Sequence, residues 1–102
     1  MFGGDNVAKV TCSIRFLPLL AKDASHSYKL VDTAIEVIRE SGLKYLVGPS
    51  ETTVEGEFDE ILELVRRLAG EMENHVERFI LDVSFDYARS GVSIDEKTAL
   101  YR

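Results

Sequence analysis

Residues 43–72 decide the fold, and they read LKYLVGPSETTVEGEFDEILELVRRLAGEM. Two short predicted strands, 43–47 and 52–56, flank the turn-forming sequence GPSE at 48–51, which predicts an antiparallel hairpin. A helix is predicted directly after it, because apolar residues recur at steps of three and four. These residues are Phe58, Ile61, Leu62, Val65, Leu68, Ala69 and Met72.

The residues before this stretch predict a strand and a helix. Residues 7–17 alternate apolar and polar side chains, with Val10, Cys12, Ile14 and Phe16 on one face, and Pro18 is expected to end the strand. Polar residues 21–27 then predict a loop. Residues 28–41 have helical spacing, with Ser25 or Ser27 as N-cap and Gly42 as a left-handed C-cap.

The residues after it complete the pattern. Residues 78–87 alternate again, with Phe79, Leu81, Val83, Phe85 and Tyr87 on the apolar face, and SIDE at 93–96 predicts a capped helix through Leu100. The fold class is therefore α+β, a single domain over 1–102 with a ferredoxin-like βαββαβ sandwich. Its four-stranded antiparallel sheet, in the order four-one-three-two, carries two helices on one face, and a short C-terminal helix follows.

Composition limits the classes of partner. Eighteen acidic and twelve basic residues give a formal charge of −6 and a pI near 4.8, so nucleic acid is a poor partner. No run of about 18 apolar residues predicts a membrane span, and residues 1–6 lack the pattern of a secretory signal. Cys12 is the only cysteine, so no internal disulfide forms, and a reducing cytoplasm is the expected compartment.

The predicted topology brings the end of the first strand beside the start of the third. Phe16 and Leu17 then lie opposite Glu51, Thr52 and Thr53, and Thr52 shares the helix-facing side with Phe16. A ring beside hydroxyls under a helix suits a small flat polar ligand. The alternative interpretation is that these are ordinary strand and core residues.

The opposite face of the sheet is predicted to be polar. It carries side chains that either face water or meet the sheet of a second copy. They are Thr11, Ser13, Arg15, Thr53, Glu55, Asp82, Ser84 and Asp86.

Residues that could carry chemistry are few. Glu71 and His75 share a helix face, but two ligands do not complete a zinc site, so no metal is expected. Cys12 on an apolar strand face is expected to act as a small hydrophobe. Asp82 and Asp86 share a strand face with arginines that would neutralise them, and no nucleophile motif is present, so no catalytic residue is predicted.

The sequence also resembles a known family. GLKY, GPS and TTVEGEFDE within residues 42–60, SIRFLP at 13–18 and AIEVIRESG at 34–42 are similar to the small thiamine- and hydroxymethylpyrimidine-binding proteins of ferredoxin-like fold. The resemblance covers nearly all of 7–102. It implies a non-catalytic protein that needs no cofactor, binds the aminopyrimidine of thiamine, and forms homodimers or homotetramers through sheet packing. The ligand-binding residues that it implies are Phe16, Leu17, Ser50, Glu51, Thr52 and Thr53.

One departure and two alternatives accompany the resemblance. Many members have PMGT where this chain has Pro49-Ser50-Glu51-Thr52, so Glu51 is unusual. The first alternative is an oligomeric regulatory module that binds another small metabolite, such as an amino acid. The second is an acylphosphatase-like enzyme, which is disfavoured because residues 17–21 read LPLLA where that chemistry needs an arginine in a glycine-rich loop.

Overall fold

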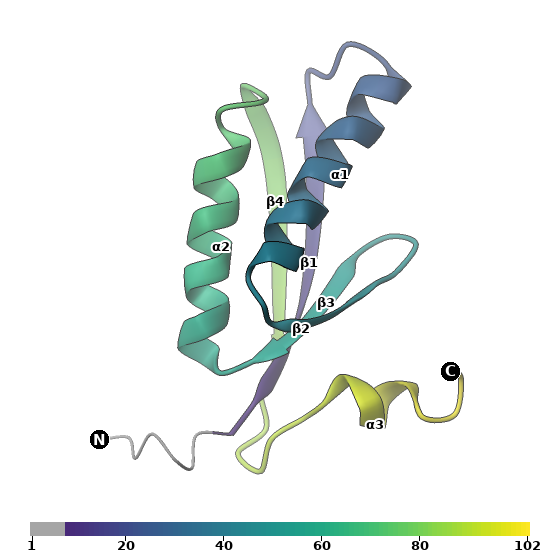
Figure 1. The fold of residues 1–102 in the computed structure, drawn as a ribbon, viewed down its shortest axis with the longest axis vertical. Helices are drawn as coiled ribbons and strands as arrows, with labels where there is room; N and C mark the ends of the chain where they lie inside the picture. The colour runs from purple at the N-terminus through teal and green to yellow at the C-terminus, as the bar shows by residue number, and fades with distance from the viewer. Residues whose placement is uncertain (1–7) are drawn as a thin grey trace.

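The computed structural model describes residues 8–102, and the predicted order of elements is confirmed (Figure 1). Two predictions concern residues outside this range: that residues 1–6 are not a secretory signal, and that Val7 belongs to the first strand. No helix in residues 8–102 is long and apolar enough to cross a membrane. The elements are β1 (Val10–Leu19), α1 (Ala24–Glu40), β2 (Lys44–Val47), β3 (Thr52–Gly56), α2 (Phe58–Met72), β4 (Arg78–Asp86) and α3 (Ile94–Thr98).

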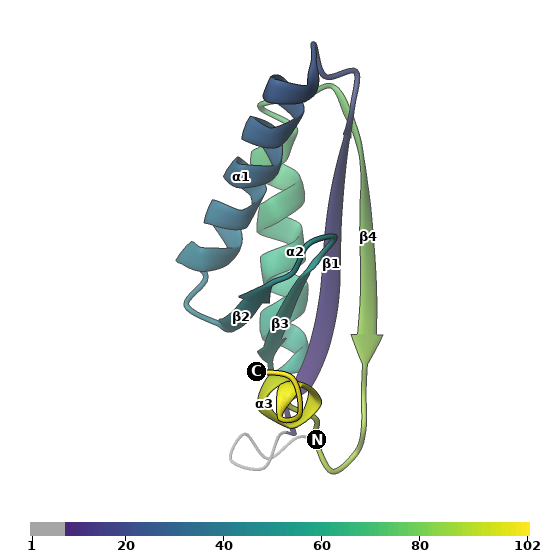
Figure 2. The ribbon, with the colours of Figure 1, turned by 90° about the vertical axis from the view of Figure 1, so that its right-hand side faces the viewer.

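The antiparallel sheet has the order β2-β3-β1-β4, as predicted, and α1 and α2 cover one of its faces (Figure 2). Strand β1 pairs with β4 over Thr11–Leu19, but with β3 only over Val10–Ile14. The sheet is therefore four strands wide at one end and two at the other. We call the part of β1 at Val10–Ile14 with its neighbours the covered end, and the part at Arg15–Leu19 with β4 the open end.

The core lies between the sheet and the two helices. The predicted helix-facing residues of β1 and β3 are confirmed as buried, and those of β4 are partly buried against them. Because β4 is at the edge of the sheet, its helix-facing side chains have a neighbouring strand on one side only. Buried from the sheet are Val10, Cys12, Ile14, Phe16 and Val54, and partly buried are Phe79, Leu81, Val83 and Phe85.

The first strand and helix begin and end at other residues than predicted. Pro18 lies inside β1, which runs on to Leu19. Helix α1 begins at Ala24, so the loop predicted over 21–27 is confined to 21–23. The N-cap is Asp23, not Ser25 or Ser27 as predicted, and its carboxylate accepts a hydrogen bond from the His26 backbone at 2.8 Å. The added first turn, 24–27, has no large apolar side chain, so it gives no apolar periodicity. Gly42 has the predicted left-handed conformation, with φ at 78°.

Most of the apolar stripe predicted for α2 is confirmed, but the prediction included Leu62 and left out Leu64. Its buried residues are Ile61, Leu64, Leu68 and Met72, whereas Leu62 is 39% exposed. A helix with apolar residues on so many positions fits several choices of stripe, and the packing against the sheet selects one. The remaining apolar residues, Phe58, Leu62, Val65 and Ala69, form a flank on the side of β4, since Phe58 contacts Phe85 and Tyr87.

The last two elements are each shorter than predicted. Strand β4 ends at Asp86, so Tyr87 lies outside it and is 65% exposed. Helix α3 has the predicted N-cap Ser93, whose hydroxyl accepts from the Glu96 backbone at 3.1 Å, but the helix ends at Thr98.

The outer face of the sheet is not polar and open throughout. At the covered end α3 crosses it, because the Ile94 backbone donates to Glu55 at 2.8 Å and Asp95 lies 2.7 Å from Lys44. Thr11, in the same cross-strand row as Glu55, is consequently 3% exposed. The neutralisation of the carboxylates is confirmed for Asp82, which pairs with Arg15 at 2.7 Å, while Asp86 pairs with Lys97 instead of Arg78.

Candidate functional site

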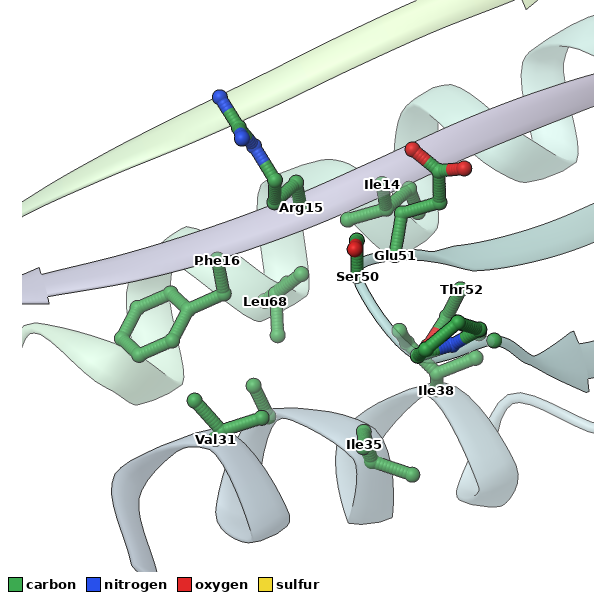
Figure 3. A pocket seen from close by; sticks show the side chains of 13 residues that line it. Ile14, Arg15, Phe16, Val31, Ile35, Ile38, Ser50, Glu51, Thr52 and Leu68 are labelled. Atoms are coloured by element: carbon green, nitrogen blue, oxygen red, sulfur yellow. The ribbon is translucent and has the colours of Figure 1, made fainter. Parts of the chain in front are cut away.

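A cavity lies where the sheet narrows from four strands to two (Figure 3). Strand β3 begins at Thr52, opposite Ile14, and the chain before Thr52 turns back into β2. Strand β1 continues past that point with no neighbour on this side, while α1 still passes over it. The space between them has a cavity volume of about 80 Å³ and opens to solvent.

The cavity combines an apolar floor with a polar rim. Floor residues come from β1, α1 and α2, and they are Ile14, Phe16, Val31, Ala34, Ile35, Ile38 and Leu68. The rim comes from β1, the hairpin turn and the first residue of β3, and its residues are Arg15, Gly48, Pro49, Ser50, Glu51 and Thr52. Such a combination is typical of sites for small molecules, in which apolar walls enclose the ligand and a few polar groups orient it.

The structure brings together four of the six residues that the sequence predicted for a site. Phe16, Ser50, Glu51 and Thr52 line the cavity. Leu17 and Thr53 are not among its lining residues, because each follows an inward-facing residue on its strand and so points to the outer face.

Phe16 and Thr52 stand at two ends of the cavity (Figure 3). Phe16 is 8% exposed, and the centroid of its ring lies 5.2 Å from that of Phe79 in a tilted arrangement. Thr52 is 4% exposed, and its hydroxyl makes no hydrogen bond with any other residue in 8–102. A hydroxyl at a largely buried position that lines a cavity is available to a ligand.

The backbone of Phe16 also faces the cavity side of β1. The Gly48 N–H donates to the Glu51 carbonyl at 2.8 Å, so the Glu51 backbone points to β2 and that of Thr52 points to β1. Backbone groups alternate along a strand, so those of Ile14 point to β3 and those of Phe16 point the same way, beyond the end of β3. Phe16 thus presents one N–H and one C=O without a strand partner.

Pro18 fits this alternation. It lies two residues after Phe16 on the same edge, where a backbone N–H would have no strand partner either. Inside a strand, proline is tolerated mainly where its missing N–H would face an unpaired edge. Its position inside β1 therefore agrees with an open edge on this side.

The charged residues of the rim point away from the apolar floor. Arg15 belongs to the outer face, where its guanidinium contacts Asp82. Figure 3 shows the Glu51 side chain directed away from Val31 and Ile35, on the side of β1. Enclosed ligand atoms would therefore meet apolar groups, hydroxyls and backbone, and a charge on the ligand would lie nearer the rim.

Sequence reasoning did not assign the α1 and α2 side of the cavity. Val31, Ala34, Ile35 and Ile38 lie within the helix predicted at 28–41, whose helical spacing indicates a buried face but not a cavity. Periodicity shows that a helix face is buried, but it does not show whether side chains or a cavity lie opposite. The one available signal is the length of the first strand beside the shorter third strand.

Other groups with chemical potential lie elsewhere. The His75 ring and the Glu71 carboxylate are 3.0 Å apart and exposed, and within residues 8–102 no group of three or more His, Cys, Asp and Glu residues could hold a metal. Burial raises the pKa of the Cys12 thiol to about 11, and a hydrogen bond from the Ser84 backbone lowers it by a smaller amount. Cys12 is therefore a poor nucleophile at neutral pH.

Comparison with known proteins relates this geometry to a family. The family described as thiamine-binding protein matches residues 12–102. A UPF0045 protein of Clostridium perfringens is 40% identical over 93 residues, which cover 90% of this chain and 98% of that protein.

Two solved structures have the same fold. A Thermotoga maritima protein provisionally assigned to thiamine biosynthesis or salvage has a TM-score of 0.86 and 46% identity, covering 92% of this chain and 99% of its own. A domain of unknown function from Bacillus cereus has a TM-score of 0.82 and 39% identity, covering 93% and 91%. Since the family matches nine-tenths of the sequence and both relatives share the whole fold, this chain belongs to the thiamine-binding protein family.

Proposed function

We propose that this protein binds thiamine through its aminopyrimidine ring in the cavity between α1, β1 and the hairpin turn, and that it does so without catalysis. The observation that carries the proposal is the interrupted sheet, which leaves an apolar slot beside an unpaired strand edge. The family supports a thiamine-like ligand. Binding of free hydroxymethylpyrimidine follows from the same argument, since that molecule is the pyrimidine part alone.

The apolar part of the cavity suits a flat aromatic ring. Val31, Ile35 and Leu68 provide a surface against which one face of a pyrimidine would pack, with Phe16 at its end. Phe79 packs against Phe16 and helps to hold its ring in place. Enclosure by these side chains supplies most of the affinity, since a micromolar constant needs about 8 kcal/mol and each hydrogen bond adds only about 0.5–1.5 kcal/mol.

The polar part of the cavity suits the hydrogen-bonding edge of an aminopyrimidine. On this edge an exocyclic amine donates next to a ring nitrogen that accepts. The unpaired C=O and N–H of Phe16 are the complementary acceptor and donor. The edge of the ring would pair with them as the backbone of a neighbouring strand does. The hydroxyls of Thr52 and Ser50 lie at the opposite end for the second ring nitrogen.

Calorimetric titration with three ligands tests this proposal. Thiamine and hydroxymethylpyrimidine should bind with similar affinity, because recognition lies in the shared ring. A pyrimidine with an oxo group in place of the amine presents the donor and acceptor in reversed order, and it should bind on the order of 10–100-fold more weakly. Absence of saturable binding of thiamine and hydroxymethylpyrimidine at millimolar concentration would refute the proposal, and binding of an amino acid instead would favour a regulatory module.

The non-catalytic role needs its own measurement. Thiamine incubated with the protein for many hours should give an unchanged proton NMR spectrum apart from line broadening. New resonances of a cleaved or altered ring would contradict a pure binding function. Salvage, transport and buffering of thiamine all remain consistent with binding, and a cytoplasmic location stays a prediction.

Assembly through the outer sheet face, as the family resemblance implies, also stays a prediction. At the open end this face includes Leu17 beside Ile80, which is 45% exposed. An apolar pair at this position supports contact with a second sheet. Cross-linking through outward-facing cysteines placed at these two positions would test it.

A further inference from the structure

The two arginines next to the cavity are each neutralised by a carboxylate of this chain. The Arg15 side chain donates to Asp82 from Nε at 3.2 Å and from a terminal nitrogen at 2.7 Å. On α1, Arg39 lies one turn after Ile35, and its Nε donates to Glu36 at 2.9 Å. Arginine binds phosphate through these same N–H groups, so the two carboxylates compete with any phosphate for them.

The N-terminus of α1 is occupied in the same way. Backbone N–H groups at the start of a helix commonly bind phosphate. Here the Asp23 carboxylate is the N-cap and accepts a hydrogen bond from the His26 backbone at 2.8 Å. The end of α1 that adjoins the open end of the sheet therefore already holds a negative charge.

Two carboxylates beside the cavity have no such partner. Glu51 lies on the rim (Figure 3), and Asp32 is exposed on α1. Within residues 8–102 neither side chain makes an ion pair or a hydrogen bond. Asp32 follows Val31 and lies three residues before Ile35, so it stands beside side chains that line the cavity. The electrostatic potential at the cavity opening is therefore negative, in keeping with the net charge of −6.

The size of the cavity keeps the charged part of a ligand at this opening. A closed cavity of about 150 Å³ holds one benzene molecule. A cavity of about 80 Å³ that opens to solvent therefore cannot enclose a second ring beside the pyrimidine. The thiazolium of thiamine, and any phosphate on its hydroxyethyl arm, would lie outside the apolar floor and near the unpaired carboxylates.

We propose that the cavity selects unphosphorylated ligands, and that Glu51 and Asp32 are the residues that determine this selectivity. The inference rests on the proposed function, because it concerns the same cavity. Thiamine carries one positive charge and hydroxymethylpyrimidine none, whereas a phosphate ester adds about 1.5–2 negative charges at pH 7. The opening attracts thiamine and repels its monophosphate.

This selectivity gives the protein a place before phosphorylation of the ligand. Transfer of a phosphoryl group from a nucleoside triphosphate to the ligand hydroxyl converts a form that the cavity holds into one that it repels. The protein therefore holds the ligand before such a kinase reaction and not after it.

Calorimetry at low and high salt tests the inference with thiamine and thiamine monophosphate. In about 20 mM salt the monophosphate should bind on the order of 3–10-fold more weakly than thiamine, and in about 1 M salt the ratio should approach one. Equal affinities at low salt overturn the inference. A ratio that salt does not change also overturns it, because the phosphate would then be excluded by its size and not by charge.

Variants assign the selectivity to residues. The double variant Asp32→Asn with Glu51→Gln should bring the low-salt ratio within about twofold of one, and Glu51→Lys should make the monophosphate the tighter ligand. Glu73→Gln is the matched control, because it removes an exposed charge at the end of α2, beyond α1 from the cavity, and should leave the ratio unchanged. The wild-type ratio in the double variant would overturn the assignment.

One lysine provides a competing explanation that the same titration resolves. Lys22 is exposed in the loop between β1 and α1 and makes no ion pair within the described residues. Lys22→Gln should leave the affinity for the monophosphate unchanged. A loss for the monophosphate alone would show that this lysine holds the phosphate, and it would overturn the inference.

Uncharged hydroxymethylpyrimidine separates failure of the inference from failure of the proposed function. Its binding to each variant reports whether the pyrimidine site is intact. If neither it nor thiamine binds to the wild-type protein, the proposed function is refuted and the inference with it. If both bind and the monophosphate binds as tightly as thiamine, only the inference is refuted.

Discussion

The two ends of the sheet use the same strand for different purposes. At the covered end β1 has a strand on each side, helices on one face and α3 on the other, and Cys12 and Val54 are completely buried. At the open end β1 has β4 alone, and its other edge borders a cavity. Complete burial stabilises the first end, whereas the second leaves polar backbone and apolar side chains available. The difference shows that a binding site can arise where one strand extends beyond the end of its neighbour.

The largest difference between the two ends should appear in the free energy of unfolding when an isoleucine is shortened to alanine at each of them. Ile61→Ala, beside the covered end, should lower the free energy of unfolding by about 2–5 kcal/mol, because it leaves a void in a packed core. Ile35→Ala, in the cavity wall, should cost less than about 1.5 kcal/mol, because this side chain is already partly exposed. Urea unfolding followed by circular dichroism measures both, and equal losses would contradict the distinction.

Alkaline pH should weaken the covered end through Cys12. The thiol has a pKa of about 11 in the native state, against an ordinary value of 9.0. Between pH 9 and 11 the unfolded chain releases this proton while the native state retains it, so stability falls as pH rises. The loss should reach about 2–3 kcal/mol at pH 11.

The control for this effect is Cys12→Ala. The variant is less stable at every pH, but the other titrating groups are unchanged, so the difference between wild type and variant should shrink from pH 9 to 11. A difference independent of pH would show that the thiol ionises normally in the native state.

A smaller effect, on ligand affinity, is expected at Thr52, where the pairing of β3 with β1 stops. Thr52→Val should weaken hydroxymethylpyrimidine binding about 2–10-fold through loss of one hydrogen bond, and should leave the fold intact. Thr53→Val is the matched control, because its side chain points to the outer face and should leave affinity unchanged. Calorimetry that finds the reverse order would move the ligand out of the cavity.

The smallest effect should come from the rim. Glu51→Gln should reduce thiamine affinity less than about threefold, because its exposed carboxylate attracts the thiazolium only through solvent. The reduction should vanish at 1 M salt and be absent for uncharged hydroxymethylpyrimidine. A large loss for both ligands would instead place Glu51 in contact with the pyrimidine.

Much of the fold was predictable because local patterns carry it. Alternation at Val10–Phe16 and at Phe79–Phe85, the GPSE turn and the cap at Ser93 each identify an element from a few neighbouring residues. Errors occurred where no apolar residue marks the structure, as in the first turn of α1, or where too many do, as in α2.

By itself the sequence determined the order of strands and helices, the inward faces of the strands, the family resemblance, and the proximity of Phe16 to Thr52. These follow from periodicity, turn chemistry and the right-handed connections of a sheet. Tertiary structure alone decided at which residue of β1 the pairing with β3 stops, that α1 passes over the unpaired part of β1, and that α3 covers Thr11 on the outer face. The physical reason is that strand pairing and helix docking depend on contacts between residues far apart in the chain, and no local pattern records where such contacts stop.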